Sequence, residues 1–304
     1  MNLTLTPIRF KQRAVSLFAD KVGIVDGDVR LTYREFGERA DRLSNALASL
    51  GVKRGERVAW LGYNSHELLE AYYGVVQMGA VLLPLNIRLT PQEIAFILND
   101  SESVALFYNR DFLPLVEALR NNAPTIKHYI SLESGEGSDP DYEALISAAG
   151  AGFTPPHDLK DDELAELFYT SGTTANPKGV MMTHRNLYLH ALQVMAGLSV
   201  TDKIVQLHTI PLFHVNGWGT PHTITGAGAR HVVARKFDPT QVLELIQQER
   251  VTNFSMVPTM AVAIINHPSL GEYDLSSLDY VGLGGAASPV DLIREVEQKL
   301  GCRA

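Results

Sequence analysis

The sequence predicts an α/β fold in which mostly parallel β-sheets are sandwiched by helices. Short apolar runs alternate with amphipathic stretches along nearly the whole chain, and turn signals separate them. The 304 residues correspond to two domains, at about 100–200 residues each. We expect a first α/β subdomain over residues 1–160 and a second, incomplete at its C-terminus, over residues 161–304, because loose polar stretches lie at 133–140 and 149–162.

Composition and charge exclude several classes of protein. Hydrophobic residues make up 45% of the chain and charged residues 20%, which excludes a disordered polymer, a collagen and a disulfide-stapled miniprotein. The formal net charge is -8, and no segment is a long run of charges of one sign. The sequence therefore gives no sign of a basic surface that would bind nucleic acid. Cys302 is the single cysteine, and neither a secretory signal nor a membrane-spanning run is found. We therefore expect a cytoplasmic, soluble protein.

The first half of the chain carries clear local signals. Residues 23–33 are expected to form a hairpin around an Asp26-Gly27 turn. Thr32 and Glu35 form a capping box that begins a helix, and Gly51 ends that helix. The other expected elements of this half are strands at 58–61, 81–83, 103–108 and 128–132, and helices over 65–78 and after residue 90.

The same alternation continues beyond residue 161. A loop rich in Gly, Ser and Thr is expected between a strand at 165–169 and a helix at 184–198. Further strands are expected at 204–207, 230–234, 252–256 and 280–283, and further helices at 238–249, 259–266 and 289–300. The last residues, 301–304, have the pattern of the start of another strand.

The most informative segment is YTSGTTANPKGV at residues 169–180, which directly follows an apolar strand. Such a loop can turn backbone N–H groups inward beside its hydroxyl donors and form a nest for a polyphosphate, to which Lys178 adds a charge-assisted hydrogen bond. The same residue types also favour an ordinary surface turn, so composition leaves both interpretations open. A Walker A loop is excluded, because five residues separate Gly172 from Lys178.

The longer string YTSGTTANPKGVMMTH resembles the phosphate-binding signature of the adenylate-forming (AMP-binding) superfamily, which includes acyl-CoA synthetases, luciferases and peptide-synthetase adenylation domains. The resemblance implies that six residues surround the β- and γ-phosphates of ATP: Thr170, Ser171, Gly172, Thr173, Thr174 and Lys178. It also implies a weak Mg²⁺ contact at Thr170. Ala175 stands where family members usually carry glycine, and a positive φ there would cost alanine about 1–2 kcal/mol.

A second segment, residues 211–219, resembles the family signature that lies between the nucleotide and the acid. The resemblance implies that His214 lies beside the reacting carboxylate, as a catalytic residue together with Lys178, and that Trp218 is a gate to the acyl tunnel. The implied acid-binding set is His214, Val215, Asn216, Gly217, Trp218, Met256, Pro258 and Thr259. Without the resemblance, His214 and Trp218 would both be interpreted as core residues. The nearby glycines would indicate either space for an acyl chain or close packing of a helix on a sheet.

Two other interpretations concern metals and dinucleotides. The spacing of His208, His214, His222 and His231 excludes a helical zinc motif. Residues 282–287 satisfy G-x-G-x-x-A, but the acidic residue expected about 20 positions later would lie beyond the end of the chain, which weakens an NAD interpretation. In the adenylate-forming family the matching turn packs on the adenine of ATP. The resemblance therefore implies that Gly284, Gly285 and Ala286 contact the adenine.

The resemblance implies an acid–thiol ligase. Such an enzyme converts ATP and a carboxylic acid into an acyl-adenylate and pyrophosphate with Mg²⁺, and then forms a thioester with coenzyme A. We expect a medium- or long-chain fatty acid, with an aryl acid and a homodimer left open. One alternative is an adenylation domain that loads a carrier protein, although no acidic residue between 211 and 234 could pair with an amino-acid ammonium group. Another is a non-catalytic nucleotide-binding module.

The resemblance covers essentially all 304 residues, but only the front part of such an enzyme. In the family, the G-Y-G-x-T-E segment with the main Mg²⁺ ligand, the ribose-binding aspartate, the hinge and the small C-terminal domain with its catalytic lysine all follow. Attack of a carboxylate on the α-phosphorus of ATP, with pyrophosphate as the leaving group, depends on positioning and on cations that neutralise phosphate oxygens. We therefore expect this chain alone to have little or no ligase activity.

Overall fold

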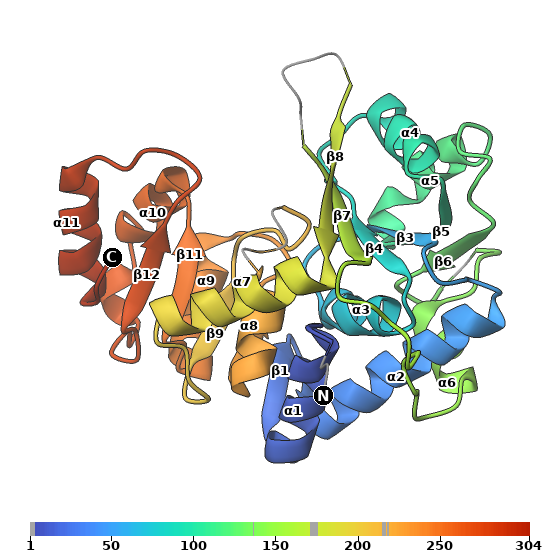
Figure 1. The fold of residues 1–304 in the computed structure, drawn as a ribbon. Coiled ribbons are helices and arrows are strands. Elements are labelled where there is room, and N and C mark those ends of the chain that lie inside the picture. Colours follow the sequence, from blue (N-terminus) through green and yellow to red (C-terminus); the bar gives the residue numbers. More distant parts are fainter. Residues whose placement is uncertain (1–3, 136, 171–175, 215–216, 218) are drawn as a thin grey trace.

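The structure is a computed structural model that describes residues 4–135, 137–170, 176–214, 217 and 219–304. Its strands form two six-stranded sheets, and helices pack on both of them (Figure 1). The expected α/β class with mostly parallel sheets is therefore confirmed. Within the described ranges, no helix is both long enough and apolar enough to cross a membrane.

The first sheet, called sheet A here, has the strand order β12-β11-β9-β10-β1-β2. Its neighbours pair in parallel, except that β1 and β2 form the expected antiparallel hairpin around the Asp26-Gly27 turn. Gly27 has a φ of 55°, which a side chain would disfavour. The strands of sheet A are β1 (Val22–Asp26), β2 (Val29–Thr32), β9 (Val205–His208), β10 (Arg230–Val233), β11 (Asn253–Met256) and β12 (Tyr280–Leu283).

The second sheet, called sheet B here, has the order β6-β5-β3-β4-β7-β8. Its neighbours also pair in parallel, except for the antiparallel pair of β7 and β8. Strand β8 corrects the expectation that the loop continues as far as residue 183. The strands of sheet B are β3 (Arg57–Leu61), β4 (Val81–Pro84), β5 (Ser103–Tyr108), β6 (His128–Ser131), β7 (Leu164–Thr170) and β8 (Lys178–Thr183).

Both sheets take strands from both sides of residue 160. Strands β1 and β2 join the strands beyond residue 200 in sheet A, while β7 and β8 join β3–β6 in sheet B. The boundary expected near residue 160 therefore does not separate the two sheets. Parallel strands are joined by long crossovers, so the loose stretches in the sequence do not reveal which sheet receives the next strand.

The helices begin and end largely where the sequence predicts. Thr32 with Glu35 and Thr90 with Glu93 form complete capping boxes. Four helices were not predicted, namely α1, α5, α6 and α8. The α-helices are α1 (Ile8–Phe18), α2 (Tyr33–Ser49), α3 (His66–Gln77), α4 (Pro91–Asp100), α5 (Leu113–Leu119), α6 (Tyr142–Ala148), α7 (His184–Gly197), α8 (Thr220–Ala227), α9 (Pro239–Glu249), α10 (Pro258–Ile265) and α11 (Val290–Leu300).

Apolar side chains pack on both faces of sheet B. They also fill the space between sheet A and the helices that cover it. In β3, Val58 and Trp60 face a core shared with α2 and α3, while Ala59 and Leu61 face a second core shared with α4 and α5. This alternation explains why the strand is apolar throughout. A third core joins sheet A to α9, α10 and α11.

Helix α3 approaches α2 closely because residue 74 has no side chain. A Cβ atom at Gly74 would lie 2.8 Å from the backbone oxygen of Ala40 and 2.8 Å from Cδ2 of Leu43. Since a backbone oxygen cannot move aside as a flexible side chain can, any larger residue forces the two helices apart.

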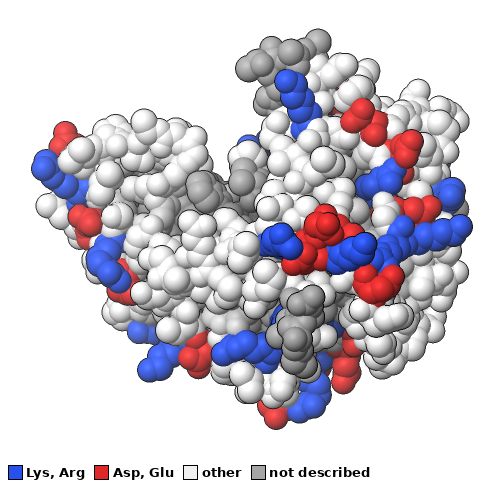
Figure 2. All heavy atoms as spheres, in the orientation of Figure 1, with Lys and Arg blue, Asp and Glu red and all other residues white. Residues whose placement is uncertain are grey.

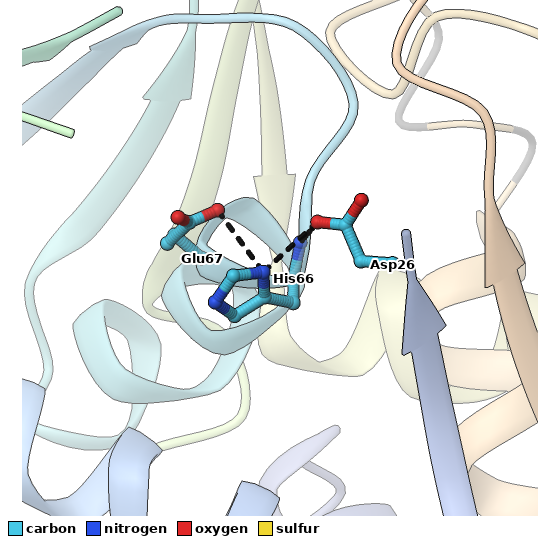
Figure 3. A group of neighbouring side chains, drawn as sticks. All are labelled: Asp26, His66 and Glu67. Atoms are coloured by element: carbon cyan, nitrogen blue, oxygen red, sulfur yellow. Dashed lines mark hydrogen bonds and ion pairs between the residues drawn. The ribbon is translucent and has the colours of Figure 1, made fainter. Parts of the chain in front are cut away.

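Residues 62–66, the loop between β3 and α3 with the first residue of α3, lie where sheet B meets sheet A. We call them the joint loop. Asp26, the last residue of β1, accepts two hydrogen bonds from His66, one from the backbone N–H and one from ring Nδ1, each 2.9 Å long (Figure 3). A carboxylate oxygen of Glu67 lies 3.4 Å from the same Nδ1. The end of β1 is therefore tied to the start of α3.

The imidazole of His66 is held in its charged form. Burial alone would lower its pKa, but the hydrogen bond to Asp26 and the negative charges of Glu67, Glu70 and Asp26 outweigh burial and raise the pKa of His66 to about 9. Because this value exceeds the unfolded value of 6.5, the interaction stabilises the fold fully below pH 6.5 and is lost as the pH rises through 9.

The first prediction concerns Asp26→Asn, which keeps an acceptor for the N–H of His66 but removes the negative charge. We expect the variant to be less stable than the wild type at pH 6, and the difference to shrink as the pH rises from 6.5 to 9.5. Urea unfolding at a series of pH values measures this difference. A difference that stays constant over the range would contradict a charged His66.

The second prediction concerns Gly74→Ala. In an open helix this change stabilises by about 1 kcal/mol, but here we expect a loss of about 1–3 kcal/mol in the free energy of unfolding because of the overpacked contact with Ala40. Gly197→Ala is the matched control, because the Cβ position at this helical glycine has no neighbour within 4 Å. Urea unfolding of both variants should give opposite signs, and equal signs would contradict the packing argument.

Candidate active site

Three segments singled out in the sequence meet at one edge of sheet A. Strands β9, β11 and β12 are parallel, so their carboxyl ends lie on the same side of the sheet. Residues 211–219 follow β9, residues 256–259 lie at the end of β11, and residues 284–286 follow β12. In open α/β sheets, ligands bind at this carboxyl edge.

The turn at residues 284–286 packs directly on the end of β11. The N–H of Gly284 donates to the carbonyl of Met256 over 3.1 Å. Gly285 has a φ of 78°, and a Cβ atom there would lie 2.9 Å from Cγ1 of Val257. Gly285 and Ala286 are exposed, so the turn presents a small, flat backbone surface to solvent.

The neighbouring segment divides into buried and accessible residues. The side chain of Met256 is 1% exposed and belongs to the core of sheet A. Pro258 begins α10 and is half-buried, and Thr259 is exposed in the first turn. Met256 therefore supports this edge from inside, while Thr259 is accessible from the surface.

The segment after β9 folds into a compact turn. The N–H of His214 donates to the carbonyl of Pro211 over 3.0 Å, and the N–H of Gly217 donates to the carbonyl of His214 over 3.1 Å. His214 is exposed, whereas Gly217 is buried with a φ of 50°. We call residues 211–214 together with Gly217 the His214 turn. Of the sequence-predicted residues in and after this turn, Val215, Asn216 and Trp218 lie outside the described residues.

The predicted phosphate loop is the tip of the β7–β8 hairpin. Thr170, the last residue of β7, pairs with Lys178, the first residue of β8, and both are exposed. Lys178 forms no ion pair with the part of the chain that the structure describes. The remaining predicted phosphate contacts, Ser171, Gly172, Thr173 and Thr174, lie outside the described residues, as does Ala175.

A buried polar contact connects the phosphate hairpin to the helix that follows the His214 turn. Nε2 of His222 in α8 donates to Oε1 of Glu166 in β7 over 2.7 Å, and neither side chain is more than 1% exposed. Tyr73 lies 3.4 Å from Nδ1 of His222. Sequence analysis did not identify Glu166, although a single acidic residue inside an apolar strand is a signal for such a contact.

A second set of buried histidines lies beneath the His214 turn. His208 and His231 approach within 2.9 Å through ring nitrogens, and His231 reaches Thr225 over 3.0 Å. Burial lowers the pKa of His208 to about 3 and also lowers the pKa of His231. Both rings are therefore neutral at pH 7. We interpret their hydrogen bonds as holding in place the wall of the cavity lined by His208, Thr209, Gly217, Thr220 and Ser255.

Among the described residues, Asp26, His66 and Glu67 are the group whose histidine and carboxylate atoms lie close enough together to hold a metal ion. A metal ligand must offer the lone pair of a neutral imidazole. His66 is protonated at neutral pH, so we interpret this group as an ion pair.

The space-filling view shows the molecular surface hollowed between the part built on β9–β12 and the part built on sheet B (Figure 2). The Glu166–His222 contact spans the two parts. The hairpin of sheet B and the turns of sheet A are thus carried by elements that are in direct contact.

Comparisons with known proteins identify the family of the chain. Residues 11–304 match the family described as AMP-binding enzyme. The long-chain-fatty-acid–CoA ligase of Thermus thermophilus is 38% identical over 296 residues, which cover 95% of this chain and 54% of that protein. The chain thus spans about half the length of the curated relatives it matches.

Solved structures share the fold. The N-terminal domain of FACL13 from Mycobacterium tuberculosis superposes with a TM-score of 0.91 at 29% identity and covers 99% of this chain and 74% of that one. The anthranilate CoA ligase AuaEII in complex with anthranoyl-AMP gives a TM-score of 0.93 at 26% identity, covering 100% of this chain and 59% of that one. Fold, motifs and sequence relatives together show that the chain belongs to the AMP-binding enzyme family.

Proposed function

We propose that this chain supplies the ATP- and acid-binding part of an enzyme that activates a medium- or long-chain fatty acid with ATP, forming an acyl-adenylate and pyrophosphate, and then transfers the acyl group to coenzyme A, and that the chain alone has little or no ligase activity. The observation that supports this proposal most directly is the pairing of Thr170 with Lys178 at an exposed hairpin tip. An exposed cation paired with the exposed Thr170 is suited to a polyphosphate, and the turns of sheet A offer surfaces for a base and an acid.

The chemistry assigns a role to each segment. A carboxylate and an α-phosphate repel each other, so the reaction requires positioning and neutralisation of the phosphate oxygens. We assign neutralisation of the β- and γ-phosphates to Lys178 with the hydroxyl groups of the loop, and a weak Mg²⁺ contact to Thr170. The backbone of residues 284–286 would hold the adenine, and His214 would lie beside the acid.

The choice of acid rests on two observations of different weight. A relative at 38% identity is named a long-chain-fatty-acid–CoA ligase, which supports a fatty acid. A structural neighbour at 26% identity contains anthranoyl-AMP, which keeps an aryl acid as the second candidate. An amino acid is disfavoured, since residues 211–234 contain no carboxylate for an ammonium group.

The third prediction concerns Lys178→Ala. Loss of a charge-assisted hydrogen bond of about 1.5–3 kcal/mol should weaken ATP binding by roughly 10- to 150-fold. Isothermal titration calorimetry with ATP measures this loss. Lys203→Ala is the matched control, because Lys203 is also exposed but lies before β9, at the amino edge of sheet A. Equal ATP affinity in the Lys178 variant and the wild type would contradict the assignment.

The fourth prediction concerns the ligand of the whole site. Non-hydrolysable sulfamoyl mimics of acyl-adenylates should bind more tightly than AMP or the free acid, because one molecule occupies both subsites. We expect a dodecanoyl mimic to bind more tightly than an anthranoyl mimic, and NAD not to compete with either. Tighter binding of the anthranoyl mimic would favour an aryl acid, and competition by NAD would contradict the assignment to ATP.

A further inference from the structure

Asn64, in the joint loop, holds the base of the His214 turn through its side-chain amide. Nδ2 donates to the carbonyl of His208 over 3.2 Å and to the carbonyl of Ile210 over 3.1 Å, while Oδ1 accepts from the N–H of Leu212 over 2.7 Å. Asn64 is 4% exposed, so these three hydrogen bonds are shielded from water.

These hydrogen bonds hold the backbone at and just beyond the end of strand β9, where it leaves the hydrogen-bonding pattern of the sheet. Strand β9 ends at His208, and the chain then leaves sheet A. The polar backbone groups that follow need partners, because a buried polar group without one is costly. Asn64 donates two hydrogen bonds and accepts one, which matches the two N–H groups and the carbonyl of its side-chain amide.

Leu212 transmits this support to the turn. Its side chain is fully buried, its carbonyl accepts a hydrogen bond of 2.7 Å from the hydroxyl of Tyr72, and its Cδ2 lies 2.7 Å from the position of a Cβ at Gly217. Both ends of the His214 turn therefore meet at Leu212. His214 projects from the turn into solvent.

Asn64 is itself held on both sides within the joint loop. The N–H of Tyr63 donates to Oδ1 of Asn109 over 2.9 Å. Ser65 caps α3 by accepting from the N–H of Leu68 over 3.3 Å, and His66 is bound to Asp26. The amide of Asn64 is thus presented by a backbone that sheet B, α3 and β1 all hold in place.

We propose that Asn64 is a positioning residue that fixes the His214 turn for the acid end of the acyl-adenylate. The proposal rests on the proposed function for the role of His214. The phosphate hairpin has its own support in the pairing of β7 with β8, so loss of Asn64 should affect the acid subsite and leave the nucleotide phosphates in place.

The fifth prediction concerns Asn64→Ala, compared with Asn45→Ala as the matched control. Asn45 in α2 also donates through its amide to two loop carbonyls, those of Gly150 and Gly152, over 2.7 and 3.0 Å. We expect Asn64→Ala to bind the dodecanoyl-adenylate mimic about tenfold more weakly, with ATP affinity changed less than about twofold. Hydrogen exchange of the Leu212 amide should speed up in this variant and not in the Asn45 control.

Two further variants keep the test decisive if the alanine variant fails to fold. Asn64→Asp preserves the shape and the acceptor but removes the two donated bonds, and Tyr72→Phe removes one bond to Leu212. Both should weaken binding of the mimic selectively. Unchanged Leu212 exchange with unchanged affinity for the mimic, or an equal loss of affinity for ATP and the mimic, would overturn the proposal. A wild-type chain that binds neither ligand would count against the proposed function, and the exchange of Leu212 would still decide whether Asn64 holds the turn.

Discussion

Buried polar groups between the two sheets constrain how those sheets can be arranged. Apolar packing is non-directional and tolerates small sliding movements. A buried hydrogen bond, in contrast, weakens steeply when its partner moves out of the required distance and angle. The contact of Glu166 with His222 crosses between sheet B and α8, and the amide of Asn64 crosses from sheet B to the chain after β9. Removing one partner of a buried hydrogen bond typically costs about 1–3 kcal/mol. The relative position of the two sheets is therefore set by a small number of polar contacts.

Local signals in the sequence predicted most of the elements but not their partners. Capping boxes such as Thr32 with Glu35 depend on residues three apart, so a sequence reveals them directly. Helix α8 was missed because its residues, TPHTITGA, include proline, glycine and β-branched threonines. It is helical because it is buried between glycines 219 and 228, both of which adopt positive φ. Strand β8 was missed because its apolar run, residues 180–182, is short and directly follows the Gly- and Thr-rich loop motif, and antiparallel pairing with β7 determines its conformation.

Segments of the candidate site could be singled out in the sequence where they lie in a long family motif. Residues 211–219, 256–259 and 284–286 were each singled out, and parallel strands bring them to one edge of sheet A. Met256 was expected in the acid pocket; its side chain is buried in the core at the carboxyl end of β11, and its contact with the acid stays a prediction. The supporting residues Asn64 and Glu166 lie 144–148 and 56 residues from the groups they bind. An acidic residue inside the apolar strand β7 signals a buried polar contact, but nothing local in the sequence indicates which distant residue is the partner.

The mixed origin of the two sheets has a consequence for synthesis of the chain on the ribosome. Sheet B has all six strands once residue 183 has emerged, so it can form early. The β1–β2 hairpin must wait for β10, which ends at residue 233, before it gains its parallel neighbour. At a translation speed of about 5–20 residues per second, that delay after completion of sheet B lasts a few seconds. During this interval Val25 of β1 lacks its core partners Leu207 and Val232, and the order of assembly is imposed by the direction of translation.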